Sequence, residues 1–157
     1  FRGPEYRFDL VRAGICLFGG GPEERPDPRL RAVATLTAPI LDIRRLGPGD
    51  RLGYGSSFTA ERPMRVAVVG AGYADGVIRA AMGRGYAWAA GARRALLAVN
   101  MDLLVIDLPE GGEIGAQVEL LGPNALLDDL AAAAGTVAHE VLVRLSSRAE
   151  RIYRGVA

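Results

Sequence analysis

Residues 65–76 read RVAVVGAGYADG, and this stretch decides between two fold classes. The apolar run at its start predicts a strand, and the glycine-rich turn after it partly fits the dinucleotide-binding fingerprint G-x-G-x-x-G. Gly70 and Gly72 match the first two glycines, but Asp75 occupies the third position and Gly76 comes one residue late. A carboxylate there would repel a pyrophosphate, and no acidic residue follows about 20 residues on to bind ribose hydroxyls. We therefore interpret the stretch as a strand that ends in a tight turn.

Short apolar runs separated by turn residues surround this strand on both sides. Runs at such spacing are typical of a β-sandwich or barrel. We therefore expect a mainly β domain, built as a Greek-key-like, partly closed barrel or sandwich. Pro39 suggests an edge or a bulge in the first strand, since proline cannot donate a ladder hydrogen bond. The expected strands are residues 32–43, 65–69, 95–99, 103–106 and 117–121.

Two short helices are expected after the last strand. Leucines and alanines recur at helical spacing after Asn124, which can cap the first helix, and Thr136 can cap the second. A further helical turn is expected within residues 77–82. At the other end of the chain, residues 6–18 predict a strand, and residues 19–28, GGGPEERPDP, predict a long loop with a domain boundary.

Composition argues against several classes of function. The net charge is +1 with acids and bases interspersed, which argues against nucleic-acid binding, and neither an apolar run of membrane-spanning length nor a signal peptide is found. All 19 basic residues are arginine, so an amine for a Schiff base cannot come from this chain. A single histidine, His139, and the lack of CxxC or HExxH patterns argue against a metal site. The single Cys16 lies in an apolar run, which favours a buried thiol and fits a cytoplasmic compartment.

Five short sequence blocks follow one another along the chain. Each block alone is a weak signal, but the five in this order are a specific one. They are VRAGI at 11–15, LGYGSSF at 52–58, GYADG at 72–76, NMD at 100–102 and GTVAHEV at 135–141. In this order and approximate spacing, the blocks resemble the C-terminal part of alanine racemase, over nearly the whole chain. The resemblance implies a cytoplasmic isomerase that interconverts L- and D-alanine and supplies D-alanine for the cell wall.

The resemblance also implies a two-domain enzyme that works as a homodimer. In that family an N-terminal α/β barrel carries pyridoxal 5′-phosphate on a lysine, and the C-terminal β domain completes the active site of the partner subunit. Residues 1–25 would then be the end of such a barrel, with its last strand and a linker, and residues 26–157 the C-terminal domain. The absence of lysine agrees with this interpretation, and the chain alone is expected to be inactive.

Tyr54, between Gly53 and Gly55, matches the family's catalytic tyrosine, which implies that it is the base acting on L-alanine in the partner's site. Racemisation removes a proton from one face of a flat carbanion and returns one on the other, so a second base must face the lysine. The pKa of a free tyrosine is about 10, so positive charge must stabilise its anion near neutral pH. From the residues alone, Tyr54 would be a ring packed at the end of a glycine-flanked strand.

The resemblance assigns three cofactor-binding residues near the N-terminus. Arg12 would face the pyridine nitrogen of the cofactor, where a guanidinium, which only donates hydrogen bonds, keeps that nitrogen unprotonated. The backbone amides of Gly14 and Ile15 would hold the phosphate. Without a barrel, Arg12 would be a surface arginine at a strand end.

Three further residues would lie at the substrate. Met101 would contact the alanine carboxylate through its backbone amide, with Asp102 beside it, and Tyr73 would contact the substrate and the phosphate region. Several positions depart from the family pattern, and these departures could admit a larger amino acid. They are Phe58, Leu97, Ala98, Asn100 and Ser147.

Two alternative functions remain open from the sequence. The chain could belong to a racemase for another, or a broader, set of amino acids. It could also be a β module that binds a partner or a small ligand and performs no chemistry. A lysine-bearing barrel upstream in the reading frame would distinguish the racemases from the binding module.

Overall fold

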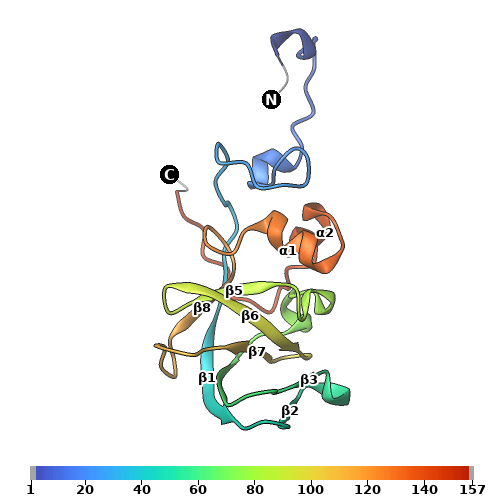
Figure 1. Ribbon diagram of the computed structural model, residues 1–157. Coiled ribbons are helices and arrows are strands. Elements are labelled where there is room, and N and C mark those ends of the chain that lie inside the picture. The colour runs from blue at the N-terminus through green and yellow to red at the C-terminus, as the bar shows by residue number, and fades with distance from the viewer. Residues whose placement is uncertain (1–2, 156–157) are drawn as a thin grey trace.

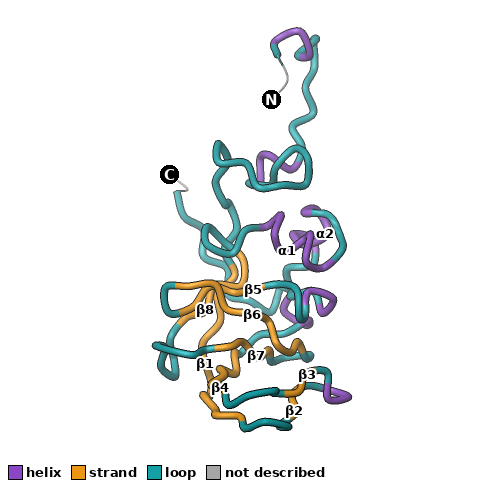
Figure 2. The backbone as a smooth tube through the Cα atoms, viewed as in Figure 1, coloured by secondary structure: helices purple, strands orange, loops and turns teal. Residues whose placement is uncertain are grey.

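The computed structural model describes residues 3–155 and shows a β-barrel with two helices and an extended N-terminal segment at one end (Figures 1 and 2). Six strands close the barrel in the order β1-β4-β7-β6-β5-β8, and every neighbouring pair is antiparallel. The prediction of a mainly β fold is confirmed, and the barrel is closed. Its strands are β1 (Leu36–Leu46), β4 (Met64–Val69), β5 (Tyr86–Ala89), β6 (Ala92–Val99), β7 (Leu104–Asp107) and β8 (Gln117–Leu121).

Smaller elements lie around the barrel. Strands β2 (Arg51–Leu52) and β3 (Phe58–Thr59) form a separate two-stranded sheet. The helices α1 (Leu127–Ala134) and α2 (Ala138–Val143) cover the end of the barrel nearest the N-terminal segment, as Figure 1 shows. The described residues 3–155 also contain five single-turn 3₁₀ helices: η1 (Pro4–Tyr6), η2 (Ile15–Phe18), η3 (Tyr54–Ser56), η4 (Tyr73–Asp75) and η5 (Arg79–Ala81).

The long strand β1 closes the barrel by pairing with two neighbours in turn. Its first part pairs with β8 and its second part with β4, and the register shifts between Ile40 and Asp42. Such irregularities bend a strand and help a sheet to close. Pro39 lies between this shift and another at Leu36, so the bulge expected near the proline is found beside it.

Apolar side chains from all six strands fill the barrel. Buried and less buried positions alternate along β5, as expected for a strand with one buried face, whereas Leu104, Val105 and Ile106 of β7 are all buried. Within residues 3–155, no helix is long and apolar enough to cross a membrane. The largest fully buried side chains are Ile40, Val66, Val69, Leu96, Val99, Leu104, Ile106, Leu108, Val118 and Val141.

The strand expected at residues 6–18 is not formed. Residues 3–35 contain only η1, η2 and irregular backbone, and Phe8 is 85% exposed. A strand must exchange backbone hydrogen bonds with a neighbour, and no described strand lies beside this segment. Most of its apolar residues are therefore exposed in this chain, although their pattern suits a buried strand, whereas Ile15 and Cys16 are partly buried.

The two predicted helix caps are wrong. Both α1 and α2 begin without a side-chain cap, after Leu126 and Val137. The Asn124 side chain instead donates from Nδ2 to Glu119 Oε2 at 2.9 Å, and the Thr136 hydroxyl bonds to Glu140. The helical turn expected within residues 77–82 is confirmed as η5.

A tyrosine–carboxylate contact ties α1 to the barrel. The Tyr86 hydroxyl on β5 donates to Asp129 Oδ2 on α1 at 2.7 Å, and the Arg93 guanidinium lies 4.2 Å from the centre of the Tyr86 ring. Burial, reinforced by the bond to Asp129, raises the pKa of Tyr86 to about 12. The folded chain therefore holds this proton more tightly than the unfolded chain, in which the pKa is about 10.

We expect Tyr86→Phe to lower the free energy of unfolding by about 1 kcal/mol at neutral pH. Because the folded-state pKa is raised, this stabilisation is complete below pH about 10 and is lost as the pH rises towards 12. Urea unfolding of parent and variant between pH 7 and 12 measures the difference. A difference that stays constant across this range would show that the Tyr86 proton does not contribute.

Candidate functional site

Two loops from different parts of the chain meet at one edge of the barrel. The turn η4 follows β4, and the connection between β6 and β7 carries Asn100 and Met101. The Tyr73 amide donates to the Asn100 carbonyl and the Ala74 amide to the Met101 carbonyl, each at 2.9 Å. The side chains of Tyr73 and Met101 remain 41% and 49% exposed. Two of the three residues predicted to lie at a substrate, Tyr73 and Met101, therefore belong to adjacent loops and are accessible.

The glycines of the GYADG block permit this close packing. A Cβ on Gly72 would lie 2.3 Å from the backbone oxygens of both Asn100 and Met101, closer than real atoms approach. The Gly72 amide donates to Asp75 Oδ2 at 2.9 Å, which closes the turn. The loop is thus the tight turn that the sequence predicted, and it packs on a neighbouring loop. One oxygen of Asp75 accepts a hydrogen bond within the turn.

An arginine near the C-terminus joins these loops. Arg148 Nη1 lies 2.7 Å from Asp102 Oδ1, and its Nε lies 3.5 Å from Asp75 Oδ1. The hydrogen bond with Asp102, followed by the charge of Asp75, raises the pKa of Arg148. No motif in the sequence marks Arg148, because its two partners lie 46 and 73 positions away.

Tyr54 lies on an exposed turn close to the same edge of the barrel. Gly53 and Gly55 have φ values of +75° and +67°, which favour glycine and turn the chain sharply around the tyrosine. The Tyr54 side chain is 69% exposed and forms no hydrogen bond with any residue in the described range. A Cβ on Gly53 would lie 3.2 Å from that of Ala98 on β6, so η3 packs beside the strand that leads to Met101.

Arg12, Gly14 and Ile15 lie elsewhere. They belong to the N-terminal segment at the top of Figure 1, whereas η3 lies near the bottom, beside β3. Arg12 and Gly14 are exposed, and no atom lies within 4 Å of the Cβ position on Gly14. Ile15 begins η2, whose first amides have no acceptor within the helix.

The predicted site residues therefore form two separate groups. The barrel-edge group contains Tyr54, Tyr73, Met101 and Asp102, and the N-terminal group contains Arg12, Gly14 and Ile15. Within residues 3–155, this chain does not bring the two groups together.

The positions that depart from the family pattern differ in exposure. Ala98 is fully buried beneath Gly53, so this position does not face an open entrance. Ser147 is exposed and immediately precedes Arg148, whereas Asn100 is half-buried and uses its backbone to hold η4. Of these three positions, Ser147 is the one with an exposed side chain beside the barrel-edge group.

Known proteins resemble this chain over nearly its whole length. A family model described as "Alanine racemase, C-terminal domain" matches residues 33–153. An alanine racemase from Rhodospirillum rubrum is 43% identical over 161 residues, which cover 99% of this chain and 43% of that protein. The chain thus spans about two fifths of the length of the curated relatives it matches.

Solved structures show the same likeness. The alanine racemase from Streptomyces coelicolor A3(2) superposes with a TM-score of 0.89 at 35% identity, covering 98% of this chain and 43% of that one. The alanine racemase from Bartonella henselae with covalently bound pyridoxal phosphate superposes with a TM-score of 0.87 at 34% identity, covering 96% of this chain and 43% of that one.

Proposed function

Because this chain belongs to the alanine racemase family, as the C-terminal domain of that type, we propose that it acts within an enzyme that interconverts L- and D-alanine. The observation that carries this proposal is the placement of the two groups of site residues. Tyr54 is exposed on η3, which lies near β2 and β3 at one end of the molecule, and the N-terminal segment lies at the opposite end (Figure 1). In a head-to-tail homodimer, each active site would take the N-terminal group from one subunit and Tyr54 from the other.

The N-terminal group fits the cofactor proposed for this enzyme, pyridoxal 5′-phosphate. The backbone N–H groups of Gly14 and Ile15 donate to no acceptor in the described residues, and the space beside Gly14 is open, so both are free to bind a phosphate. Arg12 is exposed and enters no ion pair within residues 3–155, so its guanidinium is available to face a ring nitrogen. When bound, the cofactor withdraws electron density from the α-carbon of the substrate and makes its hydrogen acidic.

The barrel-edge group would then act on the substrate in the partner's site. Tyr54 would hold or release a proton at its phenolic oxygen on one face of the α-carbon. The Met101 backbone N–H would bind the substrate carboxylate, and Tyr73 would lie beside it. Because the described residues supply no cation in contact with the Tyr54 hydroxyl, the charge that stabilises its anion would come from the partner's site.

An apolar surface next to the helices supports docking of a further domain. Phe18, Val33, Val143 and Tyr153 are exposed and line a pocket of about 630 Å³ between the N-terminal segment and the C-terminal tail. Apolar surface gathered in this way marks interaction sites in soluble proteins. We propose that the barrel domain, which would carry the cofactor lysine, packs here.

The test is racemase activity of the protein translated from the whole reading frame, across a panel of L- and D-amino acids. We expect the absorbance of bound pyridoxal 5′-phosphate and the fastest conversion with alanine. Faster conversion of serine or a larger amino acid would show that alanine is not the preferred substrate, but the proposed reaction, racemisation, would stand. Absence of both the absorbance and any racemisation would favour the non-catalytic binding module.

A further inference from the structure

The three glycines at residues 19–21 form a compact joint instead of an open linker. The Gly20 amide donates to the Ile15 carbonyl at 3.2 Å, so the glycines connect directly to η2. A Cβ on Gly20 would lie 2.5 Å from Ile15 Cγ1, and one on Gly21 would lie 1.6 Å from the Arg25 carbonyl oxygen. Neither position has room for a side chain, so the chain folds back tightly between η2 and residue 25.

A buried carboxylate fastens this joint to the β domain. Asp128, in the first turn of α1, is 3% exposed, and its Oδ2 accepts a 2.8 Å hydrogen bond from the Gly21 amide. Asp128 Oδ1 has no hydrogen-bond partner within residues 3–155. Burying a carboxylate costs free energy, and an apolar residue would suit this position better on packing grounds alone. The bond to Gly21 is therefore the specific contribution of Asp128.

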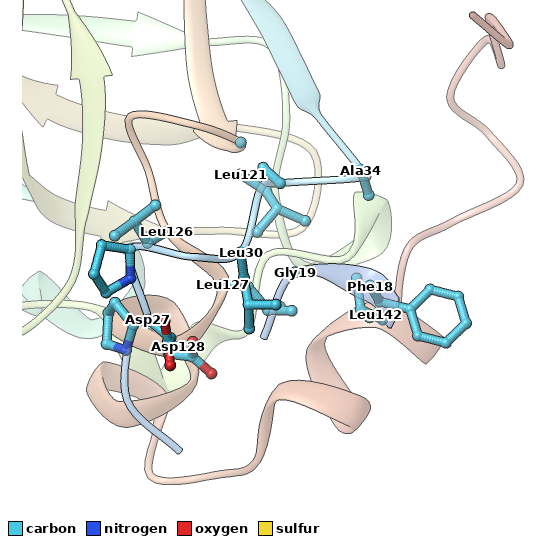
Figure 3. Close-up of a pocket in the computed structure, with 14 residues that line it drawn as sticks. Phe18, Gly19, Asp27, Leu30, Ala34, Leu121, Leu126, Leu127, Asp128 and Leu142 are labelled. Carbon is cyan, nitrogen blue, oxygen red and sulfur yellow. The ribbon is translucent and has the colours of Figure 1, made fainter. Parts of the chain in front are cut away.

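Apolar contacts beside the carboxylate complete the attachment. Figure 3 shows Leu30 from the N-terminal segment near Leu127 of α1, and Phe18 near Leu142 of α2. These residues line a cavity of about 260 Å³ that Asp128 also lines. Residues of the N-terminal segment and of both helices thus surround one cavity next to the joint.

We propose that Asp128 is a positioning residue for the cofactor phosphate. Through the Gly21 amide, it fixes residues 14–21 relative to α1, and so sets the orientation of the Gly14 and Ile15 amides. This inference rests on the proposed cofactor-binding role of those amides. It assigns to a residue of the β domain an indirect influence on cofactor binding in its own subunit.

The experiment compares Asp128→Ala with Asp129→Ala in the protein translated from the whole reading frame. The neighbouring Asp129 contacts Tyr86 and Arg93 instead of the joint, so it is a matched control on the same helix. Hydrogen exchange of residues 14–21 and the affinity of the apoprotein for pyridoxal 5′-phosphate are measured. For Asp128→Ala we expect exchange protection there to fall, and the cofactor dissociation constant to rise, by about tenfold or more, as expected for losing a hydrogen bond to a charged group.

The control variant and an isosteric one make the result decisive. Asp129→Ala should leave both measurements unchanged, and Asp128→Asn, which keeps an oxygen acceptor, should lie between parent and Asp128→Ala. Unchanged cofactor affinity in Asp128→Ala, or equal losses in the two alanine variants, would overturn the proposal. If the parent itself binds no pyridoxal 5′-phosphate, the proposed function fails, whereas the exchange of residues 14–21 still tests the joint separately.

Discussion

Tyr54→Phe is expected to lower kcat for L-alanine by about two to four orders of magnitude, the range for losing a general base. The ring stays in place, so the turn between Gly53 and Gly55 is preserved and only the phenolic oxygen is lost. Affinity for pyridoxal 5′-phosphate should change little, because the N-terminal group proposed to bind this cofactor lies at the opposite end of the molecule from η3. Steady-state kinetics with both alanine enantiomers and a cofactor titration measure the two quantities.

The isotope effect sharpens this test. If Tyr54 takes the proton from L-alanine, losing its hydroxyl should make this proton transfer rate-limiting. The kinetic isotope effect of α-deuterium on kcat should then increase more for L-alanine than for D-alanine. Tyr86→Phe is the control, because it also removes a hydroxyl but lies in the contact between β5 and α1. Equal kinetics for Tyr54→Phe and the parent would remove Tyr54 from the chemistry.

Gly72→Ala should disrupt the barrel-edge group more than any other single methyl addition there. The new Cβ would lie 2.3 Å from two backbone oxygens, which cannot move without breaking the hydrogen bonds from Tyr73 and Ala74. Overpacking and the loss of these bonds together should lower the free energy of unfolding by about 3 kcal/mol. The KM for alanine should also rise, since Met101 and Tyr73 would no longer be held together.

Gly47→Ala supplies the control for this variant. A Cβ there would have Asp50 Oδ2 as its nearest neighbour at 3.8 Å, an ordinary contact distance. Urea unfolding and steady-state kinetics of both variants separate the loss of this packing from a general intolerance of alanine. If Gly72→Ala were as stable as Gly47→Ala, the close approach of the two loops would not exist in solution.

The strands were predictable wherever strongly apolar residues lie between turn residues. Residues 117–121 were predicted with the observed bounds, and β4 begins one residue earlier than expected. β5, by contrast, was missed because its four residues, YAWA, contain two alanines, which have a low strand propensity. The strand at residues 6–18 was predicted wrongly because an apolar pattern does not show whether a neighbouring strand is present.

The separation of the candidate site into two groups could not be predicted from the sequence. The resemblance suggested each residue singly. Only the fold places Tyr73 beside the loop that carries Met101, and places the N-terminal segment with Arg12 at the opposite end of the molecule. The parts played by Arg148 and Asp128 depend on contacts across 46 and 107 positions, which no local pattern encodes. Residues 19–28 were predicted as a long loop, but the tight packing of Gly20 and Gly21 within it was not, because glycine is common both in loops and where backbones approach closely.

Subunit complementation tests most directly whether Tyr54 serves the partner's site. Tyr54→Phe and Arg12→Glu chains, carrying different tags, are co-expressed from the whole reading frame, and the heterodimer is purified. Each homodimer should be nearly inactive, whereas the heterodimer should regain about half of the parental activity, since one of its two sites is then intact. A heterodimer as inactive as both homodimers would show that Tyr54 and Arg12 act within the same subunit, and would contradict a shared active site.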